Sequence, residues 1–142
     1  MLSMPTERRR IDSLRDIVKY CDQVEEFAAG FTPDEFEHDR KTYNAVLYSL
    51  QTIGEAAIRL DKEEKRLGEG GLMERLYPDV SWPDVRGLSN IVRHGYDEID
   101  AEIIWKTATT RIQSVRDAAR QEIARLRPDA TDKDEPDISR SL

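Results

Sequence analysis

Residues 86–96 carry side chains that bind phosphate and transfer protons, crowded at the end of an expected helix. An imidazole changes its protonation state near neutral pH, and one of the two histidines of the chain lies here. A guanidinium stays charged and binds phosphate through two parallel hydrogen bonds. The side chains concerned are Arg86, Asn90, Arg93, His94 and Tyr96. Together they favour a site that binds and cleaves a phosphodiester.

Metal-free RNA cleavage needs a base for the 2′-hydroxyl, an acid for the departing 5′-oxygen and a cation for the phosphoryl oxygens. On an ideal helix Arg86, Asn90 and His94 recur every four residues and fall within about 80° of one face. Arg93 lies about 100° from His94 on the same helix. We expect His94 to act as base or acid and Asn90 to position the phosphate, with Arg86 or Arg93 as the cation.

Each of these residues also has a structural explanation. A histidine in the last turn of a helix complements the helix dipole, and a tyrosine is commonly a packed aromatic. The arginines could be plain surface charges. The sequence contains no cluster of histidines and carboxylates with metal-ligand spacing, so we expect neither a metal nor another cofactor.

The elements that must position this segment all read as helices. Apolar residues recur every three or four positions in four segments: residues 11–28, 36–60, 82–93 and 103–126. Thr32-Pro33-Asp34-Glu35 predicts a capping box before the second segment, and Asp39 could instead begin a helix after a short first one. The glycine-rich residues 68–71 and a short helical turn at 72–76 follow. Ser81 would cap the third helix, which would run to about Arg93, and Asp97 or Asp100 would cap the last.

This pattern predicts an all-α, up-and-down bundle of four to five helices, dimerising through its long helices. We expect one helical domain at residues 1–127 and an acidic, disordered tail at 128–142. Residues 101–127 hold six basic and three acidic residues, so a local basic surface can exist on a chain whose net charge is −7. No stretch is apolar enough for a membrane helix, no apolar signal core follows the N-terminus, and a lone Cys21 excludes an internal disulfide. We expect a cytoplasmic protein.

Several short blocks in order resemble the HepT-like ribonucleases of the HEPN superfamily. They include Ile53-Gly54-Glu55-Ala56, Trp82, Arg86-Gly87-Leu88, Asn90 and His94-Gly95-Tyr96, within a resemblance that spans about residues 10–126. The resemblance implies a homodimeric helical bundle whose two catalytic motifs face each other across a cleft. It also implies a minimal nucleotidyltransferase antitoxin as partner, which neutralises the toxin by adding AMP to the motif tyrosine. The family's histidine, polar residue and modified tyrosine fall on His94, Asn90 and Tyr96.

One residue departs from the family motif. The arginine that the family places directly before the asparagine is Ser89 here. A serine supplies no charge, and loss of such a cation from a phosphate site lowers the rate by about 10²–10³. Arg86, Arg93 or an arginine of a second subunit could replace it, or the protein no longer cleaves RNA.

Glu55 stands in a short block of small and apolar residues, which suggests a buried carboxylate. We considered a hydrogen bond from Glu55 to the catalytic helix or to an arginine there, against a purely structural cap or salt bridge.

Three functions are consistent with these residues. The favoured one is a metal-independent endoribonuclease toxin of a toxin–antitoxin pair, which cleaves RNA by 2′-hydroxyl attack. The alternative is a catalytically weakened HEPN protein that binds RNA or its nucleotidyltransferase partner without cleaving. A helical oligomerisation protein without a nucleic-acid role is the third.

Overall fold

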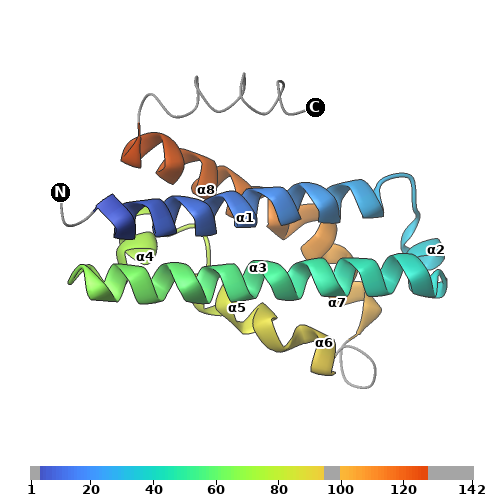
Figure 1. Cartoon of the computed structure of the whole chain (residues 1–142). Coiled ribbons are helices and arrows are strands. Elements are labelled where there is room, and N and C mark those ends of the chain that lie inside the picture. Colours follow the sequence, from blue (N-terminus) through green and yellow to red (C-terminus); the bar gives the residue numbers. More distant parts are fainter. Residues whose placement is uncertain (1–3, 95–99, 128–142) are drawn as a thin grey trace.

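The computed structural model describes residues 4–94 and 100–127, and every regular element in these ranges is a helix. The two long helices are α1 (Met4–Ala28) and α3 (Arg40–Arg66), which run antiparallel beside each other (Figure 1). The helix α8 (Ile112–Leu126) packs against α1, whereas α5 (Trp82–Gly87) packs against α3. The short helices α2 (Pro33–His38) and α4 (Leu72–Leu76) lie at opposite ends of α3 (Figure 1). The all-α bundle is confirmed.

The core forms where the apolar stripes of α1, α3 and α8 meet. Its fully buried members recur at helical spacing on each helix, and burying their apolar surface is the main stabilising contribution. Cys21 is among them. Examples from the three helices are Leu14, Ile17, Leu47, Leu50, Ile53, Ile112 and Ala119.

The junction between α1 and α3 follows the local sequence. Thr32 caps α2: its Oγ1 accepts a hydrogen bond from the Glu35 amide at 3.1 Å, and the Thr32 amide donates to Glu35 Oε1 at 2.9 Å. Asp39 then caps α3, because its Oδ1 accepts from the Thr42 amide at 3.0 Å. Both capping predictions are confirmed, and a short helix does precede the long one.

The expectation of one continuous helix over residues 82–93 is wrong. The chain forms α5, then the 3₁₀ turn η1 (Leu88–Asn90), then α6 (Ile91–His94). A Cβ at Gly54 would lie 2.3 Å from the Ser89 amide nitrogen, so the α3 and η1 backbones are in direct contact. Because a 3₁₀ turn has about three residues rather than 3.6, the stripe of Arg86, Asn90 and His94 drawn on an ideal helix does not apply.

The expected last helix is also interrupted. Asp100 caps α7 (Ala101–Lys106), with its Oδ1 accepting from the Glu102 amide at 2.9 Å. A π-helical turn, η2 (Thr107–Arg111), joins α7 to α8. The hydroxyls of Thr107 and Thr109 donate to the carbonyls of Ile103 and Trp105 at 2.9 and 2.7 Å. Such hydroxyl bonds compete with the regular backbone ladder and accompany the change of helix type.

Some expectations fall outside the described residues. These are the alternative cap Asp97, the residue Tyr96 and the disordered tail at 128–142, and the domain limit at 127 stays a prediction. Within the described residues, no helix has the length and apolarity needed to cross a membrane.

Candidate active site

Asn90 lines a groove between two segments that are distant in sequence. One wall is the α5–η1–α6 segment and the other is α7 with η2, and together they enclose a cavity of about 310 Å³. Leu88, Ile91 and Ile103 belong to its apolar lining, and Ile103 is 55% exposed. The polar lining residues are Asp84, Asn90, Thr107 and Arg111. We call this cavity the Asn90 groove.

A second cavity, of about 410 Å³, adjoins the Asn90 groove and runs along α8. The two cavities share Asp84, Leu88, Thr107 and Arg111, so Arg111 stands at their junction.

His94 is the last residue of α6, four residues after Asn90. The description of His94 is limited to its backbone, and Tyr96 lies outside the described residues. The His94 backbone therefore lies at the end of α6, which forms part of one wall of the Asn90 groove. The role of the His94 imidazole stays a prediction.

Arg86 is engaged by carboxylates of the fold. Its Nη2 donates to Glu74 Oε2 at 2.9 Å, and its Nη1 lies 4.0 Å from Asp61 Oδ1. The side chain is 24% exposed, so this contact links α5 to α4 in a partly buried setting. A phosphate would have to compete with Glu74 for the guanidinium, and this makes Arg86 a weaker candidate than the sequence suggested.

Ser89 and Arg93 lie on either side of Asn90 in the sequence, and neither lines the Asn90 groove. Ser89 is half-buried, with its backbone against Gly54 of α3. Arg93 is exposed on α6, and within residues 4–94 and 100–127 it makes no ion pair. Among the side chains that the structure describes, the motif therefore contributes no cation to the groove.

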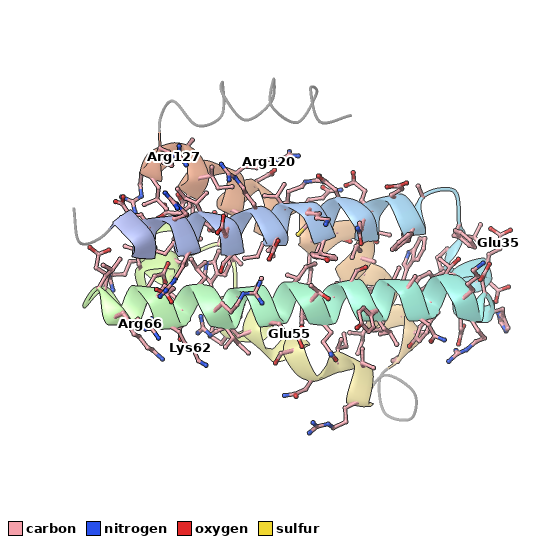
Figure 2. All side chains as sticks on the ribbon, in the orientation of Figure 1. Glu35, Glu55, Lys62, Arg66, Arg120 and Arg127 are labelled. Carbon is pink, nitrogen blue, oxygen red and sulfur yellow. The ribbon has the colours of Figure 1, made fainter. Side chains whose placement is uncertain are left out.

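The prediction of a buried Glu55 is wrong. Glu55 is exposed, and Figure 2 shows it at the surface of α3 together with Lys62 and Arg66. The small residues on either side of it explain the error: Gly54 faces η1 and Ala56 faces the core, whereas position 55 lies on the outer side of the helix. No hydrogen bond joins Glu55 to α5, η1 or α6 in the described part of the chain, so a supporting role there has no structural basis.

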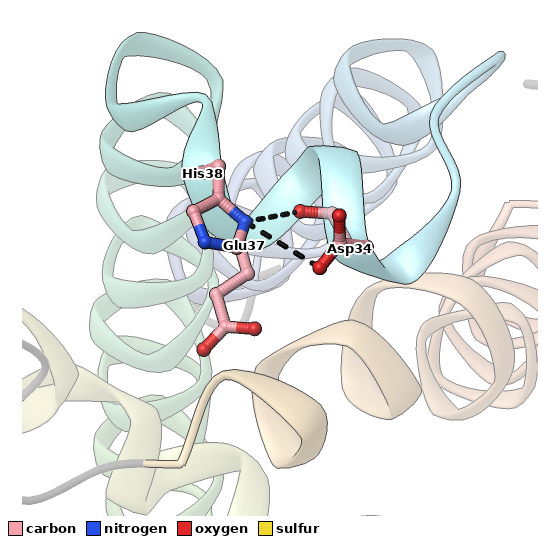
Figure 3. A group of neighbouring side chains, drawn as sticks. All are labelled: Asp34, Glu37 and His38. Atoms are coloured by element: carbon pink, nitrogen blue, oxygen red, sulfur yellow. Dashed lines mark hydrogen bonds and ion pairs between the residues drawn. The ribbon is translucent and has the colours of Figure 1, made fainter.

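The expectation that no histidine and carboxylates have metal-ligand spacing is wrong for α2, where one such group lies in the described part of the chain. Ligand atoms of Asp34, Glu37 and His38 come within 4.8 Å of one another (Figure 3). All three side chains are exposed, and His38 Nδ1 lies 2.9 Å from the Asp34 carbonyl oxygen. That hydrogen bond and the Asp34 charge raise the pKa of His38. The group shares no residue with the Asn90 groove.

The end of the bundle opposite α2 contains a buried ionic network. Glu122 is fully buried on α8, and its carboxylate accepts from Arg10 at 3.0 Å and from Tyr77 at 2.9 Å. Arg125 completes the network with two hydrogen bonds to Glu122 of 2.7 and 2.6 Å. Glu64 lies 3.5 Å from Arg10, and burial raises the pKa of Glu64 to about 7 against the opposing effect of Arg10.

Sequence reasoning missed the wall of the groove that α7 and η2 provide. The basic residues of 101–127 were noted as a group, but nothing singled out Arg111. The one available signal was Thr107-Ala108-Thr109-Thr110, a run of residues that favours a change of helix type over a regular helix.

Comparison with known proteins agrees with the resemblance seen in the sequence. A family model described as Ribonuclease HepT-like matches residues 17–122. A protein of Thermococcus cleftensis, named as a probable ribonuclease HepT, is 29% identical over 110 residues, which cover 78% of this chain and 92% of that one. A protein of Methanocaldococcus jannaschii that is provisionally named an RNase is 34% identical over 99 residues. The match covers 70% of this chain and 74% of that one.

No solved structure gave a significant match. The matched region contains α3, the Asn90 groove and most of α8. Since the family model covers well over half of the chain, the protein belongs to the HepT-like ribonuclease family.

Proposed function

We propose that this protein is an endoribonuclease that cleaves RNA without a metal ion. His94 removes the proton from a 2′-hydroxyl, the 2′-oxygen bonds to the adjacent phosphorus, and the bond from phosphorus to the 5′-oxygen breaks. An acid protonates the departing 5′-oxygen, so the products carry a 2′,3′-cyclic phosphate and a 5′-hydroxyl. Asn90 positions the phosphate in the groove.

The observation that carries this proposal is the family match, which includes the whole segment from Asn90 to His94. The Asn90 groove supports it, because an open cavity with an amide and a guanidinium in its lining suits a phosphodiester. In a homodimer, a second copy of His94 would supply the acid, since one imidazole cannot be base and acid in the same step. The dimer is part of the proposal.

Cleavage of labelled RNA by the purified protein in EDTA tests the proposal. We expect cleavage to persist and the 5′ fragment to end in a cyclic phosphate, with His94→Ala lowering the rate at least about 10³-fold. Equal cleavage by wild type and His94→Ala would show that the site is wrong. Loss of cleavage in EDTA with recovery in Mn²⁺ would show that the route depends on metal.

Ser89 favours a second candidate function, a weakened family member that binds RNA or its partner protein without cleaving. Restoring the family residue with Ser89→Arg separates the two. A gain of about 10²-fold or more in cleavage would mean that the native site is crippled. An unchanged rate in an active protein would mean that another cation already serves.

The toxin–antitoxin role is proposed from the family resemblance. A nucleotidyltransferase antitoxin would add AMP to Tyr96, and the added negative charge would oppose RNA approach in the cytoplasm, where both partners would act. Co-expression with the transferase, followed by intact-mass measurement, should show one or more added AMP units that Tyr96→Phe abolishes. An active transferase that leaves the mass unchanged would refute this role.

A further inference from the structure

We propose that Arg111, on the π-helical turn η2, supplies the phosphate-binding cation of this ribonuclease. The inference rests on the proposed function and adds to it a residue outside the motif. Arg111 lines the Asn90 groove together with Asn90, and it also lines the adjoining cavity along α8. A guanidinium there can bind the same phosphodiester that the Asn90 amide positions.

The charges of the basic segment 101–127 show why Arg111 differs from its neighbours. Most of the segment's cations are ion-paired within the chain: Lys106 to Glu102 at 3.5 Å, Arg116 to Asp22 at 2.9 Å, Arg120 to Asp22 at 3.7 Å and Arg125 to Glu122 at 2.6 Å. Arg111 and Arg127 make no ion pair with any residue that the structure describes. Of these two, Arg111 alone lines a cavity that Asn90 also lines.

Asp84 is a carboxylate that lines both cavities together with Arg111. No hydrogen bond or ion pair joins Asp84 to Arg111 in the described ranges, so a direct contact does not neutralise the guanidinium. Arg111 is exposed, which leaves its side chain accessible to a large substrate. Its backbone is held in place, because η2 sits between two regular helices and Ser114 Oγ donates to the Arg111 carbonyl at 3.0 Å.

The helix type supports a functional position. A π turn holds its backbone in i→i+5 hydrogen bonds, is rare, and is frequently found at functional sites. Here the π turn spans Thr107–Arg111, so the same turn contributes two polar residues, Thr107 and Arg111, to the groove. The neighbouring Ile103 is an exposed apolar side chain on the same wall, suited to contact with a nucleobase.

The competing cations are placed less well. Arg86 is held by Glu74 at 2.9 Å, and Arg93 is exposed on α6 but does not line the groove. An arginine of a second subunit is a further source. Substitution of Arg111 therefore distinguishes these assignments, with Arg127 as a matched control. Arg127 is also exposed and without an ion pair in the described residues, and Figure 2 shows it at the end of α8 farthest from α6.

The experiment has a cleavage arm and a binding arm. In the cleavage arm, Arg111→Ala, Arg111→Lys and Arg127→Ala are compared with wild type on a labelled single-stranded RNA in EDTA, after thermal melting confirms that each is folded. We expect Arg111→Ala to lower kcat/KM about 10²-fold and Arg127→Ala to change it less than about twofold. Arg111→Lys should fall between wild type and Arg111→Ala, since an ammonium keeps the charge without the two-pronged contact.

In the binding arm, the same substitutions are made in a His94→Ala background, and RNA affinity is measured against salt concentration. Loss of one phosphate contact should reduce the slope of log affinity against log salt by about 0.7, in Arg111→Ala but not in Arg127→Ala. A wild type that cleaves, with Arg111→Ala equal to Arg127→Ala, would overturn the Arg111 assignment and leave the proposed function standing.

A wild type that does not cleave would refute the proposed function instead. The salt dependence of RNA affinity would then test the Arg111 site independently of cleavage. Equal slopes for Arg111→Ala and Arg127→Ala, or undetectable RNA binding, would overturn the Arg111 assignment.

Discussion

Two arginines of the bundle have opposite environments. Arg10, on α1, is 3% exposed and lies between the carboxylates of Glu64 and Glu122, at 3.5 and 3.0 Å. Arg111, on η2, is exposed at the junction of two cavities and makes no ion pair in the described residues. A buried guanidinium must be compensated by carboxylates for the chain to fold, whereas an uncompensated one can persist only where water or a ligand reaches it. The comparison separates arginines that hold the fold from arginines available to RNA.

Removing Glu122 should have the largest effect on stability. Glu122→Ala leaves Arg10 and Arg125 without their common acceptor and leaves the Tyr77 hydroxyl without the hydrogen bond it donates. Breaking a buried ion pair from one side costs about 3–5 kcal/mol, so we expect a loss of that size in the free energy of unfolding, measured by urea titration. A loss below about 1 kcal/mol would mean that water hydrates these charged groups or that their side chains rearrange.

The pH dependence of stability should reveal Glu64. Its folded-state pKa of about 7 lies above its ordinary value of 4.5, so the protonated carboxyl stabilises the fold fully below about pH 4.5. That contribution is lost as pH rises through about 7. It amounts to roughly 3 kcal/mol at most, from about 1.4 kcal/mol per pKa unit.

The comparison variant is Glu64→Gln, which stays neutral. Denaturation at pH 5 and pH 8 should show wild type losing more stability than Glu64→Gln across this interval. Parallel pH profiles of the two proteins would contradict the raised pKa. Asp61, Glu74 and Glu122 also raise it, so these carboxylates stay unchanged in both proteins.

A methyl group at Gly54 should disturb the segment that carries Asn90. A Cβ at this position meets the Ser89 amide nitrogen at 2.3 Å and the Leu88 carbonyl carbon at 2.7 Å, both backbone atoms that cannot rotate away. We expect Gly54→Ala to lose about 1–3 kcal/mol and to lower RNA cleavage, because η1 must shift and Asn90 shifts with it.

Gly87→Ala is the matched control, since a Cβ there meets nothing within 4 Å. It should be neutral or stabilising by up to about 1 kcal/mol, as expected for replacement of a helical glycine. Similar losses in both variants would mean that contact between α3 and η1 is not the cause.

Arg86 is the intermediate case and should give the smallest effect. It is partly exposed and hydrogen-bonded to Glu74, so it resembles Arg10 more than Arg111. Arg86→Ala should lower the free energy of unfolding by about 1 kcal/mol or less and RNA cleavage by less than about threefold. A loss of cleavage as large as that of Arg111→Ala would place Arg86 in the phosphate site and remove the distinction between arginines bound by carboxylates and arginines available to RNA.

The parts of the fold that could be predicted depend on neighbouring residues. The capping box at Thr32 and Glu35, the cap at Asp39 and the apolar stripes of α1, α3 and α8 are local patterns, and the structure confirms them. The changes of helix type at η1 and η2 could not be predicted from periodicity. Over so few positions, 3₁₀, α and π helices give similar patterns of apolar residues. The misplacement of Glu55 has another cause: its small neighbours pack inward on a regular helix, whereas Glu55 faces outward.

The sequence by itself determined the helical class, which follows from apolar spacing, and the family, which follows from the resemblance that the family match bears out, whereas the motif roles of Asn90 and His94 stay predictions. Only the tertiary structure decided which arginines are already bound to carboxylates and which wall faces Asn90. The physical reason is that charge compensation and cavity lining are made between segments far apart in the chain. Glu74 and Arg86 are twelve residues apart, and Asn90 and Arg111 meet in one groove only because α7 and η2 pack beside α5 and η1.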